Sequence, residues 1–147
     1  MRTKGLKGIE AVMKNLNKVV KDTKQKSFAG LIDCGILIRR ETEEGNPITP
    51  LDTSNLTNSW FITTAFSTIS GSQADSSTVA EAKSIVTSKT YPTMIFGYTA
   101  NYAAYVHEMH ANVDWTRPGS GPYWLYKAIR KNEQEMLKIL QENIKID

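Results

Sequence analysis

The sequence predicts the α+β fold class, with a long helix near each end of the chain and a small sheet between them. Three observations predict it. Apolar residues recur at the helical period over residues 7–40 and again over residues 122–145, and two short runs between them are rich in aromatic and β-branched residues. At 147 residues the chain has the length of one domain. We therefore expect a single domain, residues 1–147.

The first helix is expected over residues 7–40, with one apolar stripe that packs on the rest of the domain. Gly30 and Gly35 each lower helix stability by roughly 1 kcal/mol relative to Ala, so a bend or close backbone packing is expected there. A loop follows, because Pro47 and Pro50 cannot continue a helix. The stripe consists of Ile9, Val12, Leu16, Val19, Val20, Thr23, Ser27, Leu31, Cys34 and Ile38.

Two strands are expected in the middle of the chain. Residues 60–66 alternate in a β pattern, and residues 93–98 form the second run. Residues 67–77 are small and polar, and we expect them to be a flexible, exposed loop. Residues 79–86 fit either two turns of helix or a strand, because so short a stretch does not decide the period; we favour a short helix.

The last helix is expected from about residue 122, where Pro122 is tolerated in a first turn, to about residue 145. Its polar face carries charged residues. Its apolar stripe is formed by Trp124 or Leu125, Ala128, Ile129, Met136, Leu137, Leu140 and Ile144.

The net charge of +3 hides an asymmetry. Residues 1–40 hold ten Lys or Arg against three Asp or Glu, whereas the remainder holds eight against twelve. A basic helix can neutralise phosphates on DNA, lie against an acidic neighbouring subunit, or form a solvated face. We favour a solvated or subunit-facing helix, because aromatic residues do not interleave the lysines as single-strand binding would favour.

The sequence shows no transmembrane run and no apolar core of a signal peptide, so neither membrane insertion nor secretion is expected. Cys34 is the only cysteine, which excludes an internal disulfide and suits a reducing compartment such as a bacterial cytoplasm.

Two segments carry a family resemblance. Residues 52–60 read DTSNLTNSW, and residues 96–125 contain FGY, YAAYVHE and TRPGSGP before Trp124 and Leu125. In order and spacing they resemble the signature of a tailed-phage neck family, whose members are tail-completion, tail-component or minor capsid proteins. In that family, Gly is usual at the position of Ser54. The resemblance covers about half of the chain and implies that the two strands pair antiparallel in a small sheet.

The resemblance implies a structural virion protein of a tailed bacteriophage. Such a protein forms a homo-oligomeric ring, expected to be a hexamer, in the neck, where it joins the tail to the head connector. The implied partners are a head-closure or adaptor protein and a tail tube or tail terminator protein, with passing contact to phage DNA in the channel. The implied location is the virion, with assembly in the cytoplasm of the host bacterium.

No catalytic constellation stands out, so we expect no enzyme and no cofactor. His107 and His110 are spaced i, i+3, one residue short of a metalloprotease motif; with Asp114 they could hold a metal, but we favour a structural role for His107 and Glu108. Residues 117–122 lack the Lys of a phosphate-binding loop and favour a turn into the last helix. Cys34 lies on an apolar stripe, which favours a small core residue over a nucleophile.

Function is therefore expected to reside in surfaces. The candidate contact regions are the loop over residues 67–77, the loop over residues 109–121 and the chain ends. In the second loop, Trp115 is either a lid over the core or an interface anchor. The candidate interface residues are Trp115, Arg117, His110 and Asp114. The candidate core residues are Trp60, Phe66, Phe96, Tyr102, Tyr105, Trp124 and Leu125.

Two rival functions remain. A basic DNA-binding protein would lay the N-terminal helix along phosphates through Lys14, Lys18 and Lys21. A small hydrolase is disfavoured, because the sequence offers no constellation for it.

Overall fold

The computed structural model describes residues 2–50, 54–109 and 113–145, with side chains from residue 8 onward. Six helices and three strands are present in these ranges, and the class is α+β, as the sequence predicts. In chain order the elements are α1 (Arg2–Glu44), α2 (Asn55–Asn58), β1 (Trp60–Thr63), β2 (Thr68–Ser70), α3 (Ser76–Thr87), β3 (Ile95–Tyr98), α4 (Ala103–His107), α5 (Trp124–Lys131) and α6 (Glu133–Ile144).

The three strands form one antiparallel sheet in the order β2-β1-β3. Both predicted strands and their antiparallel pairing are confirmed, with β1 ending at Thr63. The prediction that residues 67–77 form only a loop is wrong, because residues 68–70 pair with β1. This edge strand is exposed along its whole length, so no apolar alternation reveals it in the sequence.

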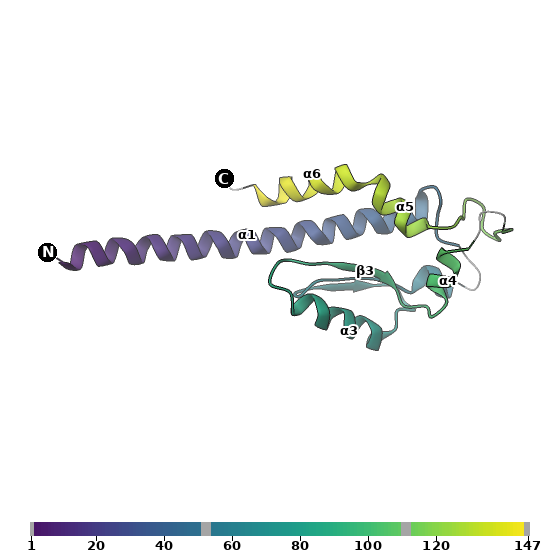
Figure 1. The fold of residues 1–147 in the computed structure, drawn as a ribbon, viewed down its shortest axis with the longest axis horizontal. Coiled ribbons are helices and arrows are strands. Elements are labelled where there is room, and N and C mark those ends of the chain that lie inside the picture. Colours follow the sequence, from purple (N-terminus) through teal and green to yellow (C-terminus); the bar gives the residue numbers. More distant parts are fainter. Residues whose placement is uncertain (1, 51–53, 110–112, 146–147) are drawn as a thin grey trace.

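The sheet lies between α1 and α3, which cover opposite faces (Figure 1). This sandwich explains why consecutive residues of β1 are buried on both faces. Toward α1 the packing is close, since a Cβ atom added at Gly35 would lie 2.8 Å from Ile62 Cγ2. From the other side, α3 contributes buried Ala82 and Val86, and the helix expected at residues 79–86 is confirmed.

Helix α1 is longer than predicted, and only its C-terminal half packs on the domain. The N-terminal half projects away from the body (Figure 1), and residues 8–22 are all exposed. The prediction that the whole stripe packs on the domain is therefore wrong for Ile9, Val12, Leu16, Val19 and Val20. Their period is that of a packed helix face, but no element within the described part of this chain reaches them.

The predicted last helix is divided at Asn132 into α5 and α6. The Asn132 amide Nδ2 donates to the Ala128 carbonyl at 2.8 Å, and its backbone N–H donates to Ile129 O at 3.2 Å. Beyond this break, α6 lies along α1 (Figure 1). Gly30 allows the two helices to approach closely, because a Cβ atom added there would lie 3.1 Å from Leu140 Cδ2.

The core contains Trp124, which is 1% exposed, whereas two other predicted core residues are at the surface. Phe66 is 69% exposed because the chain turns between Thr64 and Ser67 and places it at the hairpin tip. Its ring forms a T-shaped pair with Phe28 of α1, with centroids 4.8 Å apart. Tyr105 is 73% exposed because the single turn of α4 points it outward. The remaining candidates are half-buried: Trp60, Phe96, Tyr102 and Leu125.

Candidate interaction site

The end of α4 and the start of α5 are held together by His107. Its backbone carbonyl accepts a hydrogen bond from the Tyr123 N–H at 2.7 Å, and its imidazole Nε2 accepts from the Tyr126 N–H at 3.3 Å. The first N–H groups of a helix have no partner inside the helix. His107 thus supplies acceptors to the N-terminus of α5, which lies 16 to 19 positions later in the sequence.

The imidazole of His107 also meets Glu108, with 3.0 Å between Nδ1 and Oε1. Because Nε2 accepts a hydrogen bond, these contacts assign the proton to Nδ1, which donates to the Glu108 carboxylate. The ring packs edge-on against Trp124, with centroids 4.8 Å apart. This geometry gives His107 and Glu108 a structural role of the kind expected from the sequence.

Beneath His107, Trp124 connects the last helices to the sheet. Its ring packs edge-on against Tyr98 of β3, with centroids 5.9 Å apart. The Tyr98 hydroxyl lies 3.0 Å from Thr49 Oγ1, which donates to the Thr42 carbonyl at the end of α1. Burial raises the pKa of the Tyr98 phenol, and the Thr42 and Thr49 hydroxyls act in the opposite direction. The sequence did not single out these two buried threonines, because Thr carries no apolar signal.

The two segments that carry the family resemblance meet just before the start of β1. Ser59 is fully buried, and its carbonyl accepts from the Thr99 N–H at 2.9 Å while its Oγ accepts from the Ala100 N–H at 3.2 Å. Residues 51–53 lie outside the described ranges. Ser54 has a φ of 66°, in the left-handed region where glycine is favoured. Ser54 stands where the family usually has Gly, and its backbone conformation is strained for any residue with a Cβ atom.

The loop over residues 109–121 is attached to its own domain near its C-terminal end. Arg117 Nη1 donates to Thr49 O at 3.3 Å, and Nη2 lies 3.4 Å from Glu43 Oε2. Arg39 contacts the other Glu43 oxygen at 2.8 Å, so Glu43 lies between two arginines. Arg117 thus already has partners within the chain, and its role at an interface stays a prediction.

Trp115 is half-buried and lines a cavity of about 270 Å³ with Leu56, Tyr102 and Val106. This position does not decide between its two predicted roles, a lid over the core and an interface anchor. Asp114 is exposed, and His110 lies outside the described residues. The interface predicted for these residues remains a prediction.

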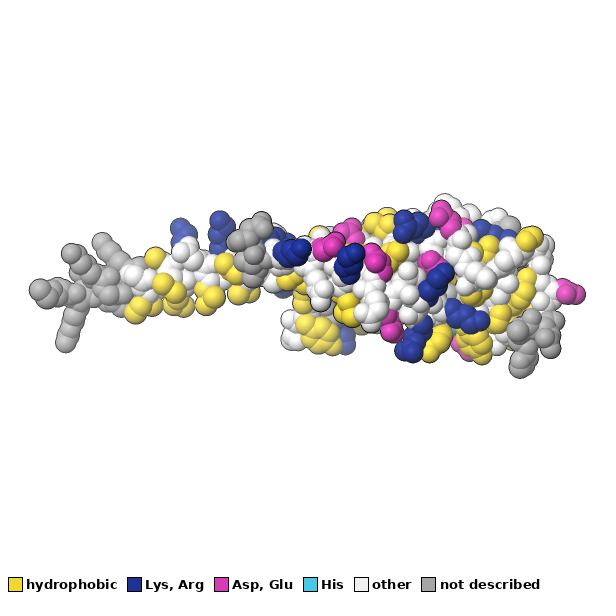
Figure 2. Space-filling view, turned by 90° about the horizontal axis from the view of Figure 1, so that it is seen from above, with side chains coloured by type: hydrophobic (Ala, Val, Ile, Leu, Met, Phe, Trp, Pro, Cys, Tyr) yellow, Lys and Arg dark blue, Asp and Glu magenta, His cyan; other side chains and the backbone are white. Residues whose placement is uncertain are grey.

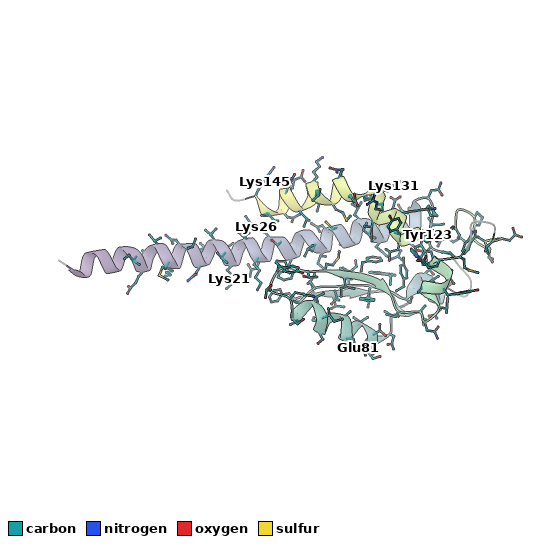
Figure 3. The ribbon with its side chains drawn as sticks, in the orientation of Figure 1. Lys21, Lys26, Glu81, Tyr123, Lys131 and Lys145 are labelled. Atoms are coloured by element: carbon teal, nitrogen blue, oxygen red, sulfur yellow. The ribbon has the colours of Figure 1, made fainter. Side chains whose placement is uncertain are left out.

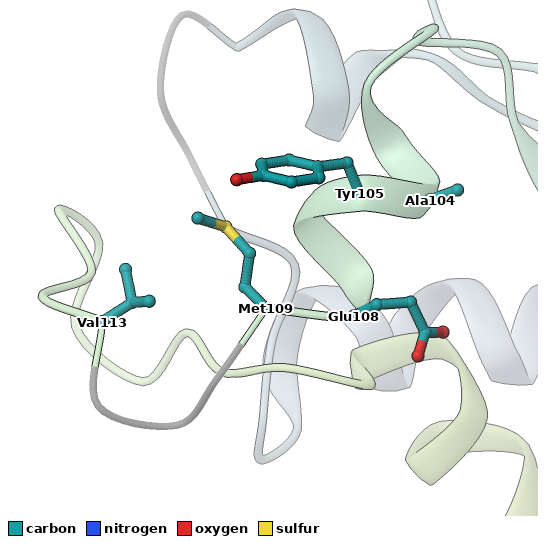
Figure 4. Close-up of a pocket in the computed structure, with 5 residues that line it drawn as sticks. All are labelled: Ala104, Tyr105, Glu108, Met109 and Val113. Atoms are coloured by element: carbon teal, nitrogen blue, oxygen red, sulfur yellow. The ribbon is translucent and has the colours of Figure 1, made fainter.

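A second hollow, of about 460 Å³, lies beside α4. Figure 4 shows the Tyr105 ring and the Met109 side chain extending to the same side of the chain, where Val113 faces them, with Glu108 directed away. Its lining is mainly apolar and contains a single titratable carboxylate, Glu108.

Metal and thiol chemistry find little support in the described residues. No group of three or more His, Cys, Asp or Glu in these ranges could hold a metal ion. The arrangement of His107, His110 and Asp114 involves His110, which is outside them. Burial raises the pKa of the Cys34 thiol, an effect to which Asp33 adds, and a raised pKa disfavours the reactive thiolate.

Searches with the chain against family models, curated proteins and solved structures gave no match. In the part of the chain that the structure describes, no helix is both long and apolar enough to cross a membrane.

Proposed function

We propose that this protein is a structural virion protein of a tailed bacteriophage that forms a ring in the neck and joins the tail to the head connector. One observation carries the proposal. The segments that resemble the neck family are far apart in sequence, yet they form one packed unit around Ser59, Tyr98, His107 and Trp124. Contact between the two segments is what a fold shared with that family would require.

Two local features also support the proposal. Ser54 has the backbone conformation that suits the glycine usual in that family. The Gly-Pro segment before α5 has close packing, since a Cβ atom at Gly121 would lie 2.9 Å from Pro47 Cβ. At Ser54 the sequence departs from the family's usual Gly, while the backbone there has a positive φ, which Gly adopts readily.

The partners implied by this function are copies of the chain in a six-membered ring, a head-closure or adaptor protein, and a tail tube or terminator protein. A closed ring needs two complementary patches on each subunit. The hollow beside α4 with exposed Tyr105, and the neighbouring Asp114, supply one patch on the body.

The test is deletion of the gene in the phage, with heads and tails counted separately by electron microscopy. Filled heads and unattached tails should accumulate, and the wild-type gene in trans should restore infectious particles. A Tyr105→Ala variant should fold normally, because its side chain is exposed, and should complement poorly. A deletion phage with parental yield would overturn the proposed function.

A DNA-binding function is the second candidate, favoured by one observation. Lys14, Lys18 and Lys21 lie on one face of the projecting half of α1, and Figure 2 shows lysines on the side opposite the hydrophobic residues. It predicts duplex-DNA affinity that falls steeply with salt, with a slope reduced by about one for each neutralised lysine. Weak binding that is unchanged when all three are replaced by Gln would eliminate this candidate.

A further inference from the structure

A row of apolar side chains runs along the projecting half of α1, and no other element of the described chain covers it. Their exposed fractions range from 43% to 65%. The row spans three turns, over which residues 8–22 are all exposed. We call it the projecting stripe, and its members are Ile9, Val12, Met13, Leu16, Val19 and Val20.

The projecting stripe continues a helix–helix interface that exists within the chain. Closer to the body, the same face of α1 packs on α6: Gly30 meets Leu140, and Cys34 Sγ lies 3.5 Å from Met136 O. This cover ends near Lys26, whose Nζ donates to Lys145 O at 2.8 Å (Figure 3). N-terminal to Lys26, the apolar face continues but is not covered by α6. The same face that packs on a helix near the body is therefore open to another helix here.

The charges of α1 are placed so that they do not repel a second copy of the stripe packed against the first. At about 100° per residue, Lys14, Lys18 and Lys21 lie on the face opposite the stripe. The flanks of the stripe carry the neutral Asn15 and Asn17. Over residues 9–20, a second helix with the same stripe would therefore meet no like charge along the seam, although the helix as a whole is basic.

The composition and width of the stripe favour a helix bundle. The stripe repeats every seven residues. Ile9, Val12 and Met13 form the first set of three, and Leu16, Val19 and Val20 occupy the equivalent positions one heptad later. Three apolar positions per heptad are typical of a helix in a bundle, and Ile, Val and Leu are typical of its seams. The aromatic residues common on membrane-surface helices are missing from residues 8–22.

The area is also sufficient. Burying the six side chains on two copies would remove on the order of 1,000 Å² of surface from water, the lower limit for a specific interface. An amphipathic helix is stabilised mainly by packing of its apolar face, which residues 8–22 lack within the described chain.

We propose that the projecting half of α1 is an oligomerisation helix whose stripe packs against the same stripe on other copies of this chain. This inference rests on the proposed function only for the need to form a homo-oligomer, and it adds a contact surface on α1 to the patch on the body. It requires no phage component, so purified protein is sufficient to test it.

The experiment compares Leu16→Lys with the matched control Ala11→Lys. Each adds one positive charge to an exposed position of α1, but Leu16 lies within the stripe and Ala11 on the opposite face. Light scattering after size exclusion and sedimentation velocity, over a concentration series, should show association of the wild type and of Ala11→Lys. Leu16→Lys should weaken association by at least about tenfold. Its melting temperature at a concentration where all three are monomeric should match that of the control.

A disulfide test gives a second readout. Under mild oxidation, Leu16→Cys should form covalent dimers and Ala11→Cys should form far fewer, and Cys34 is buried and does not compete. A wild type that stays monomeric throughout, or a Leu16→Lys variant that associates like the wild type, would overturn the inference. So would a monomeric wild type that binds anionic vesicles through the stripe. Deletion of the gene tests the proposed function separately. A phage that assembles without the protein would contradict the neck function but not self-association through the stripe. A protein that stays monomeric would contradict the association but not the result of the deletion.

Discussion

His107 contributes to the fold through three polar groups at once. Its carbonyl and its Nε2 accept hydrogen bonds from α5, and its Nδ1 donates to Glu108. A neutral imidazole is one of the few side chains that can donate and accept on opposite edges of one ring. These contacts explain in physical terms how the His-Glu pair at the end of α4 supports the fold.

Trp124 carries the packing between the sheet and the last helices. Trp124→Ala should lower the free energy of unfolding by about 3–5 kcal/mol, as for other buried large aromatics. Trp124→Phe is the matched control and should cost clearly less, because the buried indole Nε1 has no hydrogen-bond partner among the described residues. Urea denaturation of both variants measures the difference. Equal losses would mean that the indole nitrogen, not ring packing, is what matters.

At Ser54, a substitution is expected to stabilise the protein. Its left-handed backbone conformation strains any residue that carries a Cβ atom. Ser54→Gly should therefore raise the free energy of unfolding by roughly 0.5–1 kcal/mol. The control is Ser72→Gly, at an exposed turn with no positive φ, which should be neutral or destabilising. A loss of stability in Ser54→Gly would show that this strain is absent in solution.

At the scale of residues, the sequence predicted the burial of Trp124, whereas two other core candidates are exposed. Trp124 follows from its place on a helical stripe. Phe66 failed because alternation alone does not reveal where a strand stops, and a hairpin turn after Thr63 reversed its environment. Tyr105 failed because one turn of helix has too few residues for its inward face to be identified.

Elements far apart in sequence meet at Tyr98, which joins β3 to the end of α1 through Thr49. Its pKa is raised by burial above the ordinary value of 10.0, so at alkaline pH the unfolded chain loses this proton before the folded one. Stability from this source is fully present below pH 10 and is lost as the pH rises through the folded pKa. Tyr98→Phe should start less stable, having lost the Thr49 contact, but should show a flatter decline above pH 10. Parallel slopes in thermal unfolding would contradict this assignment.

Helix α3 depends on its N-cap. Asp75 Oδ2 accepts hydrogen bonds from the Thr78 N–H at 3.0 Å and from the Ser77 and Thr78 hydroxyls, which lower the pKa of Asp75 to about 2. Because the folded pKa is below the unfolded one, this stabilisation is present above pH 3.8 and is lost as the pH falls through about 2. Asp75→Ala should speed amide hydrogen exchange in α3 at neutral pH, whereas Asp75→Asn should retain most of the protection. Unchanged exchange in both would refute a capping role.

The elements themselves were largely predictable, and their ends were not. The long helices follow from sustained periodicity, whereas the break at Asn132 depends on side-chain and backbone hydrogen bonds that no period reveals. The pairing of β2 with β1 depends on the turn at Thr64, where polar residues look like any loop. The candidate interface residues were chosen from residue type alone, and Arg117 shows that an Arg in a loop can be committed to its own domain.

The whole molecule consists of a compact body and a helix that extends beyond it. An apolar stripe in a sequence shows that a helix face needs a partner, but it does not show whether the partner belongs to the same chain. Near the body that partner is α6, and farther out the chain supplies none within the described residues. The sequence could therefore predict the stripe, whereas its division into a covered and an uncovered part required the three-dimensional arrangement.

This division leads to a prediction about truncation. A chain that begins at residue 21 loses the projecting stripe but none of the buried residues of α1, so its melting temperature should change by less than about 2 °C. A chain that begins at residue 32 also loses buried Phe28 and the Gly30 contact with α6, and it should be strongly destabilised. Circular dichroism melts at low concentration compare the two with the full chain, and sedimentation should find the residue-21 chain monomeric. If that chain did not fold, the projecting half would stabilise the body directly, and the separation of the two halves of α1 would be wrong.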